Sequence, residues 1–303
     1  MRNVVGLILL SALIGCKQTG GGAAGSAAGE GKTFSIRGRI VSVDAAKGSV
    51  LLDGGAVPGF MEAMTMSYKL KEASVIGELH PGDRIMAKLL VRKTSDGYGD
   101  PQLDEIVVTA QAKPDYKPAV QYHVPAADDE VPDFKLVNED GKTIHLAQFR
   151  GRVLLLTFIY TRCPLPDFCP KMSKNFAEVD KALQGDPSLY KETHLLSISF
   201  DPKEDTPAVL KSYGVVYAGG AGKDRFAHWD FAAPPMDELA AVTQWFNVGV
   251  TPGDGASSSD AALTHSLSTV LVGKDGKVVA WYPTNEWTPA EMLVAVKSAV
   301  GAS

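Results

Sequence analysis

A continuous apolar run followed by two cysteines and a helix start is the feature that most constrains the fold of this chain. Residues 153–160 read VLLLTFIY, without alternation of polar and apolar side chains. Such a run predicts a strand that is buried on both faces of a sheet. Cys163 and Cys169 come next, and Pro170 opens a stretch with helical spacing through Leu183. A buried strand that leads into a helix predicts an α/β domain.

The rest of residues 131–303 alternates in the same way. An opening hairpin is predicted at 131–137 and 143–146, further strands at 195–200, 269–272 and 278–282, and helices at 207–213, at 236–246 and from Thr288. Thr288 and Glu291 have the spacing of a capping box around Pro289. Strands that alternate with helices give an α/β sandwich. The cysteine pair at a strand-to-helix junction makes this sandwich thioredoxin-like.

Residues 32–111 have a different pattern, without a convincing long helix. Apolar and polar residues alternate in five short segments that are separated by glycine- and proline-containing turns. The predicted strands are 34–43, 49–52, 64–70, 85–92 and 103–108. Five short strands that close on themselves fit a small all-β, OB-like barrel. The predicted fold class is therefore multidomain, with this barrel followed by the thioredoxin-like α/β domain at 131–303.

Composition marks two connecting segments. The chain has 303 residues, of which 45% are hydrophobic, so it has room for two domains. Residues 17–31 are rich in Gly, Ala and Ser and are predicted to form a flexible tether. Residues 112–130 contain prolines and an acidic run and are predicted to form an inter-domain linker. The formal net charge of −5 argues against nucleic acid as a partner, because there is no cationic footprint.

Residues 1–16 predict export and a lipid anchor. A basic start is followed by an apolar stretch from Val4 to Ile14, which is too short to span a bilayer, as in a secretory signal. The ending Leu13-Ile14-Gly15-Cys16 resembles the bacterial lipobox, which implies lipidation of Cys16. A plain signal peptide with an incidental cysteine is the alternative. We expect the protein in the cell envelope, anchored to the membrane by lipid and facing the periplasm or another extracytoplasmic space.

Cys163, Cys169 and His265 form a ligand set that suits Cu(I). Two thiolates and one imidazole make a soft, three-ligand site. His265 lies just before the predicted strand at 269–272, in the loop that faces the cysteine site in a thioredoxin-like fold, so its imidazole should point at the sulfurs. The same two sulfurs can instead cycle between dithiol and disulfide. Copper handling and thiol redox chemistry both stay open at this point.

The spacing of the cysteines favours a metal between them. Redox thioredoxins have two residues between their cysteines, whereas this chain has five, and Pro164 and Pro166 stiffen that loop. A disulfide needs Cα atoms about 4.4–6.8 Å apart, which the loop reaches only by turning back on itself. The N-terminus of the helix at Pro170 is expected to favour a thiolate at Cys169 and so to lower its pKa.

A methionine cluster in the small domain is a second candidate copper site. Met61, Met64 and Met66 lie within six positions, and the whole chain has eight methionines. Met64 and Met66 share one face of a predicted strand, because alternate strand residues point the same way. Thioether sulfur is a soft, neutral ligand that suits Cu(I). Methionine also fills hydrophobic cores, and this purely structural role is the alternative.

The run Ala63-Met64-Thr65-Met66 after Pro58-Gly59-Phe60-Met61 resembles the periplasmic copper- and silver-binding domain of the CusF type. That family is a five-stranded barrel, and the resemblance implies copper bound by Met64 and Met66. The upstream histidine of the family falls near Asp53, and its capping tryptophan is replaced by Met61. Met61 is therefore expected to donate a third thioether in an all-methionine site.

Residues 131–300 resemble the Sco/SenC family. The matching motifs are TFIYTRCP at 157–164 with Cys169-Pro170, SFDPKEDTP at 199–207, and His265-Ser266. The resemblance implies a thioredoxin-like fold and copper bound by the two cysteines and the histidine. It also implies delivery of copper to the dinuclear copper centre of cytochrome c oxidase, and some members act as thiol reductases for that centre. Most members have three residues between the cysteines, against five in this chain.

The resulting hypothesis is a lipid-anchored copper metallochaperone with two sites rather than an enzyme. The methionine-rich barrel captures Cu(I), and the linker presents it to the cysteine site, which delivers it to the copper-centre subunit of cytochrome c oxidase or to another copper protein. Two alternatives stay open. The chain is either a thiol–disulfide oxidoreductase that uses Cys163 and Cys169 alone, or a periplasmic copper-resistance buffer.

Overall fold

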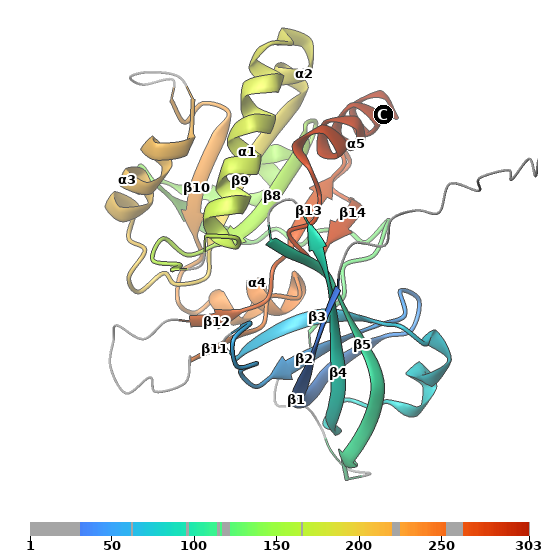
Figure 1. The fold of residues 1–303 in the computed structure, drawn as a ribbon. Coiled ribbons are helices and arrows are strands. Elements are labelled where there is room, and N and C mark those ends of the chain that lie inside the picture. The colour runs from blue at the N-terminus through green and yellow to red at the C-terminus, as the bar shows by residue number, and fades with distance from the viewer. Residues whose placement is uncertain are drawn as a thin grey trace, which may run out of the picture.

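The structure is a computed structural model with two domains, an all-β barrel and an α/β domain (Figure 1). It describes residues 31–61, 63–94, 97–113, 116, 122–164, 166–219, 225–252 and 263–302. Cys16, the predicted signal and nearly all of the predicted tether lie outside the described residues. No helix within the described ranges is long and apolar enough to cross a membrane.

The N-terminal domain is a closed five-stranded barrel. Its strands are β1 (Gly31–Asp44), β2 (Ser49–Gly54), β3 (Met64–Leu70), β4 (Arg84–Thr94) and β5 (Gly97–Ala110), in the order β1-β2-β3-β5-β4, with a 3-10 helix at Ala73–Glu78. All five predicted strands are therefore present, and the domain is all-β as predicted. That the barrel is of the OB-like type stays a prediction.

The inward side chains of the barrel form its core. The largest fully buried ones are Ile36, Ile40, Leu52, Tyr68, Ile85, Leu89 and Leu103. Gly38 marks the place where β1 and β2 come closest. A Cβ atom at this position would lie 2.5 Å from the Asp53 carbonyl oxygen, so only glycine fits.

The α/β domain is built on a seven-stranded sheet. Its strands are β6 (Lys135–Asn138), β7 (Thr143–His145), β8 (Val153–Ile159), β9 (Thr193–Ser199), β10 (Trp229–Ala233), β13 (Thr269–Val272) and β14 (Val278–Tyr282), in the order β14-β13-β8-β9-β10-β6-β7. β8 and β9 run parallel, and β13 runs antiparallel to β8. Every residue of β8 is buried, as the uninterrupted apolar run predicts. A separate hairpin pairs β11 (Val250–Pro252) with β12 (Leu263–His265).

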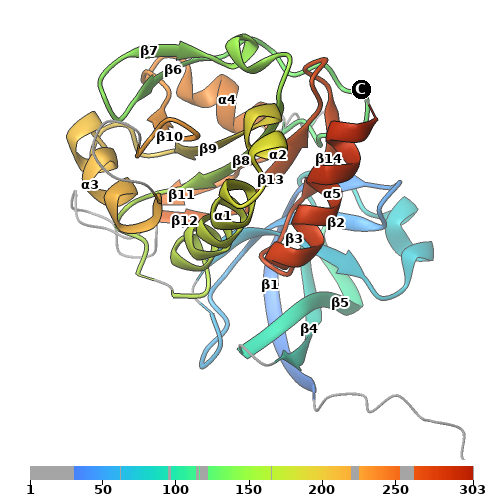
Figure 2. The same cartoon turned by 90° about the horizontal axis from the view of Figure 1, so that it is seen from above.

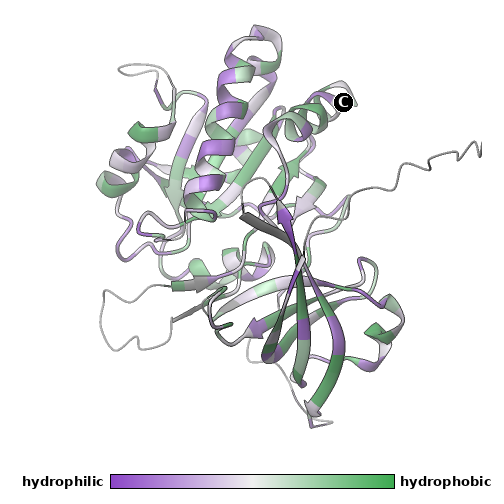
Figure 3. Cartoon of the chain, viewed as in Figure 1, coloured by the Kyte–Doolittle hydropathy of each residue, from purple (hydrophilic) through white to green (hydrophobic). Residues whose placement is uncertain are grey.

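Helices cover both faces of this sheet (Figure 2). They are α1 (Cys169–Gln184), α2 (Pro187–Glu192), α3 (Pro207–Tyr217), α4 (Leu239–Trp245) and α5 (Pro289–Gly301), with a 3-10 helix at Leu146–Phe149. α1 and α5 pack together over β8, whereas Phe246, which ends α4, packs against Phe158 on the other face. The central strands are mainly hydrophobic, and hydrophilic residues line α1 on its outward side (Figure 3). The predicted α/β class is confirmed.

Residues 122–130, placed in the linker by their composition, lie against the α/β domain. The backbone N–H of His123 donates to the carbonyl of Gln244, and that of Asp128 donates to Val278, both at 2.9 Å. Glu130 forms a β-bridge with Lys277. The second half of the predicted linker is therefore held in place by backbone hydrogen bonds.

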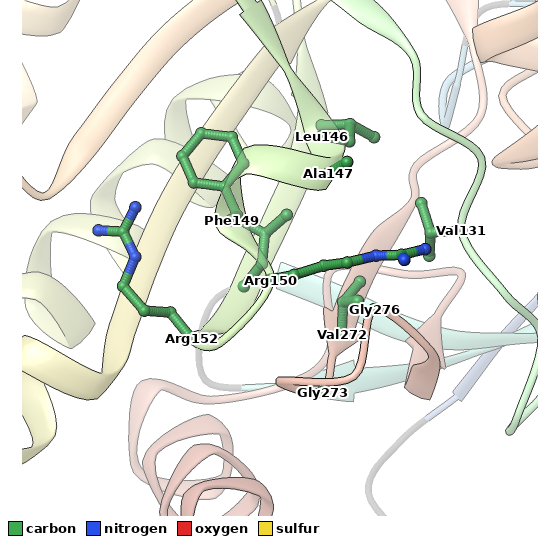
Figure 4. Close-up of a pocket in the computed structure, with 10 residues that line it drawn as sticks. Val131, Leu146, Ala147, Phe149, Arg150, Arg152, Val272, Gly273 and Gly276 are labelled. Carbon is green, nitrogen blue, oxygen red and sulfur yellow. The ribbon is translucent and has the colours of Figure 1, made fainter.

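A crevice at the N-terminal end of β8 measures about 20 Å³ (Figure 4). The side chain of Arg150 extends across it toward Val131, and its Nη2 atom donates to Glu130 Oε1 at 2.8 Å. This volume holds about one water molecule. The crevice lies at the opposite end of β8 from the cysteines and is too small for a ligand.

Glu139, in the turn between β6 and β7, gives a prediction for the pH dependence of stability. Burial raises its pKa from 4.5 to about 7, although its Oε2 atom accepts the N–H of Phe231. Between these two pH values the folded chain holds a proton that the unfolded chain releases, so the free energy of unfolding falls as pH rises through this window. Glu139→Gln keeps an acceptor and removes the titration. Urea unfolding should show this variant more stable than the wild type by about 1 kcal/mol at pH 8, with no gain at pH 4.5. An equal stability difference between Glu139→Gln and the wild type at both pH values would contradict the raised pKa of Glu139.

Candidate metal centre

Two thiols and one imidazole converge at one end of the α/β domain. One ligand atom each from Cys163, Cys169 and His265 can be chosen so that all three lie within 4.8 Å of one another. The Cys169 Sγ atom lies 3.6 Å from His265 Nε2. Three ligands about 2.0–2.3 Å from one metal ion in a trigonal plane lie roughly 3.5–4 Å apart. The predicted set is therefore assembled at close to coordinating distance.

The sheet topology brings these residues together. Cys163 follows the C-terminal end of β8, and Cys169 is the first residue of α1. β13 runs antiparallel to β8, so the start of β13 lies beside the C-terminal half of β8, where Thr269 pairs with Thr157. His265 ends β12, four residues before that pair. An antiparallel strand thus returns the distant histidine to the cysteine end of the sheet.

The imidazole has a fixed orientation and tautomer. His265 Nδ1 lies 2.9 Å from the backbone carbonyl oxygen of Ser266. A carbonyl oxygen only accepts hydrogen bonds, so Nδ1 carries the proton and donates it. Nε2 is then left with its lone pair directed at Cys169 Sγ. This is the usual arrangement of a metal-ligating histidine, whose other nitrogen donates to a carbonyl or carboxylate.

Aromatic rings enclose the histidine. The ring centroids of Phe200, Tyr160 and Phe168 lie 4.6, 5.4 and 6.3 Å from that of His265. Tyr160 also donates its hydroxyl proton to the carbonyl of Leu263, on the strand that carries the histidine. His265 is 4% exposed and Cys169 is fully buried, whereas Cys163 is half-buried. A partner's ligand therefore reaches the site most readily from the side of Cys163.

Burial reverses the expected effect on the thiol of Cys169. The sequence led us to expect a lowered pKa from the helix N-terminus. In the structure the pKa of the Cys169 thiol lies well above its usual value. The main cause is burial of the thiol, and the second is its contact with Cys163. Removal of a thiol from water disfavours its charged form, and here this outweighs the helix dipole. Cys163 and Cys169 are not joined by a disulfide in the structure.

The cysteine loop is anchored by Asp205, whose role was not identified from the sequence. This carboxylate is 1% exposed and accepts from the backbone N–H and hydroxyl of Thr161 and from the hydroxyl of Ser199. Its pKa is raised by burial, against the effect of these hydrogen bonds. Thr161 lies two residues before Cys163, so Asp205 fixes the start of the loop. Nearby, Arg162 forms an ion pair with Asp201 at 2.6 Å.

Two other buried histidines have structural roles. His228 bonds Asp180 through Nδ1 at 2.7 Å and Thr193 through Nε2 at 2.9 Å. His194 bonds Asp230 through Nε2 at 2.7 Å. Their ring nitrogens already have partners within the core, so they are not available as ligands.

The methionine cluster is described in part. Met64 lies in β3, but its side chain lies outside the described part of the chain. Met61 and Met66 are half-buried and pack against the barrel core. The hydroxyl of the buried Tyr68 lies 3.9 Å from the sulfur of Met61. Two of the three predicted thioethers thus lie at one edge of the core, close enough to the surface to meet a ligand.

Comparison with known families gives a match for each of the two domains. The family model SCO1/SenC matches residues 123–301, which is more than half of the chain. The chain belongs to the SCO1/SenC family. The model of the copper binding periplasmic protein CusF matches residues 33–98 of this Sco protein. Both predicted resemblances are confirmed. Together with the ligand set, these matches confirm copper as the metal.

Individual relatives match more than half of the chain. A SCO1 protein homolog from Bacillus subtilis is 31% identical over 175 residues, which cover 56% of this chain and 82% of that protein. The copper-bound structure of ScoI from Bradyrhizobium japonicum is 25% identical, with a TM-score of 0.47, and the match covers 56% of this chain and 99% of that one. BsSco, described with a disulfide switch as a member of the Sco family of cytochrome c oxidase assembly proteins, is 30% identical with a TM-score of 0.46, covering 60% and 98%.

Proposed function

We propose that this Sco protein is a copper metallochaperone that delivers Cu(I) to the dinuclear copper centre of cytochrome c oxidase. The observation that carries the proposal is the convergence of one ligand atom each from Cys163, Cys169 and His265 within 4.8 Å. Soft thiolates favour Cu(I) over harder ions. A three-ligand site with one half-buried thiol also suits transfer, because an incoming ligand can reach the ion before the buried ligands release it.

The barrel would capture copper for this site. Met61 and Met66 supply thioethers that need no deprotonation to bind Cu(I), and Met64 is the third sulfur of the proposed set. The match of residues 33–98 to a copper-binding family supports the same assignment. Thioethers alone bind less tightly than thiolates, so copper would pass from the methionines to the cysteines.

The protein would act outside the cytoplasm, held at the membrane by lipid on Cys16. The exported location follows from the signal-like residues 1–16. Outside the cytoplasm no glutathione pool keeps thiols reduced. A bound Cu(I) ion would protect the Cys163 and Cys169 thiols from oxidation until delivery.

The proximity of the two thiols supports a second candidate function, a thiol–disulfide reductase for the cysteines of the oxidase copper centre. In that reaction Cys163 and Cys169 lose two electrons and two protons and form a disulfide, while the client disulfide takes them up and opens to two thiols. Histidine is not needed for this exchange, so His265 distinguishes the two functions. A copper-resistance buffer, the third possibility, would need no client protein.

Transfer to a client tests the proposal. The full chain, loaded with one equivalent of Cu(I), is mixed with the copper-free soluble domain of the oxidase copper-centre subunit in its reduced form, and the two are then separated. The wild type should transfer copper to the client, and the amount transferred should fall at least tenfold for His265→Ala. His123 is an exposed histidine, so His123→Ala should transfer as much copper as the wild type. Retention of copper by the wild-type chain would reject delivery. Undiminished reduction of the oxidised client by His265→Ala, without copper transfer, would establish the reductase.

A further inference from the structure

We infer that copper passes from the methionine site to the cysteine site inside the molecule, through a chamber between the two domains. This inference rests on the proposed function, because it supplies the route between its two sites. The chamber measures about 330 Å³. Its lining includes Phe60, Met61 and Met66 from the barrel and Phe168, Leu267 and Asn285 from the α/β domain. The methionine site therefore faces one space together with Phe168, the residue directly before Cys169.

The domains are packed together, so the chamber is part of the fold. Strand β3, which carries Met64 and Met66, packs against the β11–β12 hairpin, which ends at His265 (Figure 1). The packing is close enough that a Cβ atom on Gly249 would lie 2.6 Å from Cγ2 of Thr65. Glycine at this position leaves room for the side chain of Thr65 against the backbone of the α/β domain. The linker at 112–130 therefore does not have to move for the methionine site to face the α/β domain.

A second contact fixes the same arrangement from the other end of the barrel. The ammonium group of Lys47 lies 4.1 Å from the ring centroid of Trp281 in β14 and 3.4 Å from the carbonyl oxygen of Pro125. A cation held over the face of an aromatic ring is attracted by it, and this attraction grows when the contact is shielded from water. Contacts at β3 and at Lys47 together hold the barrel in one orientation on the α/β domain.

The chamber wall offers soft ligands on the barrel side. The thioethers of Met61 and Met66 line it, and the hydroxyl of buried Tyr68 contacts the Met61 sulfur. A monovalent soft ion such as Cu(I) is the cargo that these ligands accept. The apolar residues Phe60 and Phe168 line the chamber beside these sulfurs.

Phe168 stands between the chamber and the cysteine site. Its side chain lines the chamber, its ring lies edge-on to the ring of His265, and the next residue is Cys169. Asn285, also in the lining, donates from Nδ2 to the carbonyl of Asp167 and so holds the loop beside Phe168. A change of the Phe168 side-chain rotamer would open the way from the chamber to the imidazole and the buried thiol.

The transfer is a ligand exchange without a redox change. Copper stays Cu(I), its bonds to the methionine sulfurs of the barrel break, and bonds to two cysteine sulfurs and His265 Nε2 form. Two thiol protons leave to solvent through the half-buried side of Cys163. The methionine sulfurs return to their neutral, unbound state, so they are ready for another ion.

Loading kinetics of the full, reduced chain test the route. Cu(I) is offered as a complex with a competing chelator, and the thiolate–copper absorption of the cysteine site is followed with time. Met61→Leu/Met64→Leu/Met66→Leu removes the capture site of the barrel. Thr284→Phe fills the chamber, whose lining includes Thr284, and changes no residue of either ligand set. Met86→Leu, in the same barrel but outside the chamber lining, and Thr284→Ser are the matched controls.

We expect both chamber variants to load at least tenfold more slowly than the wild type and the controls, with final occupancy and affinity unchanged within about twofold. Phe168→Ala should load faster than the wild type. Loading of both chamber variants at the wild-type rate would overturn the route and leave the cysteine site intact. Failure of the wild-type chain itself to bind Cu(I) through its thiols would instead overturn the proposed function.

Discussion

Replacement of Cys169 by serine is expected to abolish tight Cu(I) binding at the cysteine site. Serine offers a hard, protonated oxygen in place of a soft thiolate, and the loss should reach roughly a thousandfold in affinity, because even residues that only orient a metal ligand change affinity about 10–100-fold. The folded state should survive, since the new hydroxyl can donate to His265 Nε2 as the thiol does. Competition titration with a Cu(I) chelator measures the change.

His265→Ala should weaken Cu(I) binding in the same titration by a comparable factor, since the imidazole is one of three ligands. His123→Ala is the matched control, because His123 is exposed and pairs with Asp129 far from the thiols. Wild-type affinity in both Cys169→Ser and His265→Ala would place the tight site elsewhere in the chain.

The second large effect is expected for Asp205→Ala. The substitution leaves the N–H and hydroxyl of Thr161 and the hydroxyl of Ser199 without their acceptor. A fully buried group left unpaired costs about 1–3 kcal/mol. Ser199 is buried, whereas Thr161 is half-buried and can bond water instead, so the free energy of unfolding should fall by about 2–4 kcal/mol in total. Because Thr161 begins the cysteine loop, Cu(I) affinity should fall as well, by about 10–100-fold.

Urea unfolding and Cu(I) titration of the same preparation separate the two effects of Asp205→Ala. Asp140→Ala is the control, since Asp140 pairs with Lys142 and Lys211 on the surface, where such ion pairs are worth about 1 kcal/mol or less. Equal stability and affinity in both variants would show that the buried carboxylate does not anchor the loop.

The sequence was sufficient to predict the architecture around the site. The unbroken apolar run of β8 identified a strand buried on both faces, and Pro170 marked the start of α1. Thr288 and Glu291 form the capping box expected at the start of α5. These signals are local, since each depends on neighbouring residues in the chain, and for that reason they could be read without the fold.

Contacts between distant segments could not be predicted in this way. The anchoring role of Asp205 depends on a hydrogen bond to Thr161, 44 residues earlier. Three strands were absent from the prediction. β11 and β12 have too few residues for a clear alternation of polar and apolar side chains. β10, with the sequence WDFAA, is short, and nearly all of its residues are buried, so it shows no alternation either. The pKa of Cys169 was predicted with the wrong direction because burial depends on the packing of the whole domain. The packing of residues 122–130 and of β3 on the α/β domain could not be predicted either, because composition carries no information on contacts between distant segments.

The central claim is that two sulfurs and one nitrogen hold a single Cu(I) ion. X-ray absorption at the copper edge of the full chain, loaded with one equivalent of Cu(I), tests it most directly, with Met61→Leu/Met64→Leu/Met66→Leu as the background that removes the thioethers of the barrel site. We predict two sulfur ligands and one nitrogen ligand, and loss of the nitrogen in His265→Ala. A spectrum without nitrogen in the wild type, or one unchanged by His265→Ala, would contradict the account.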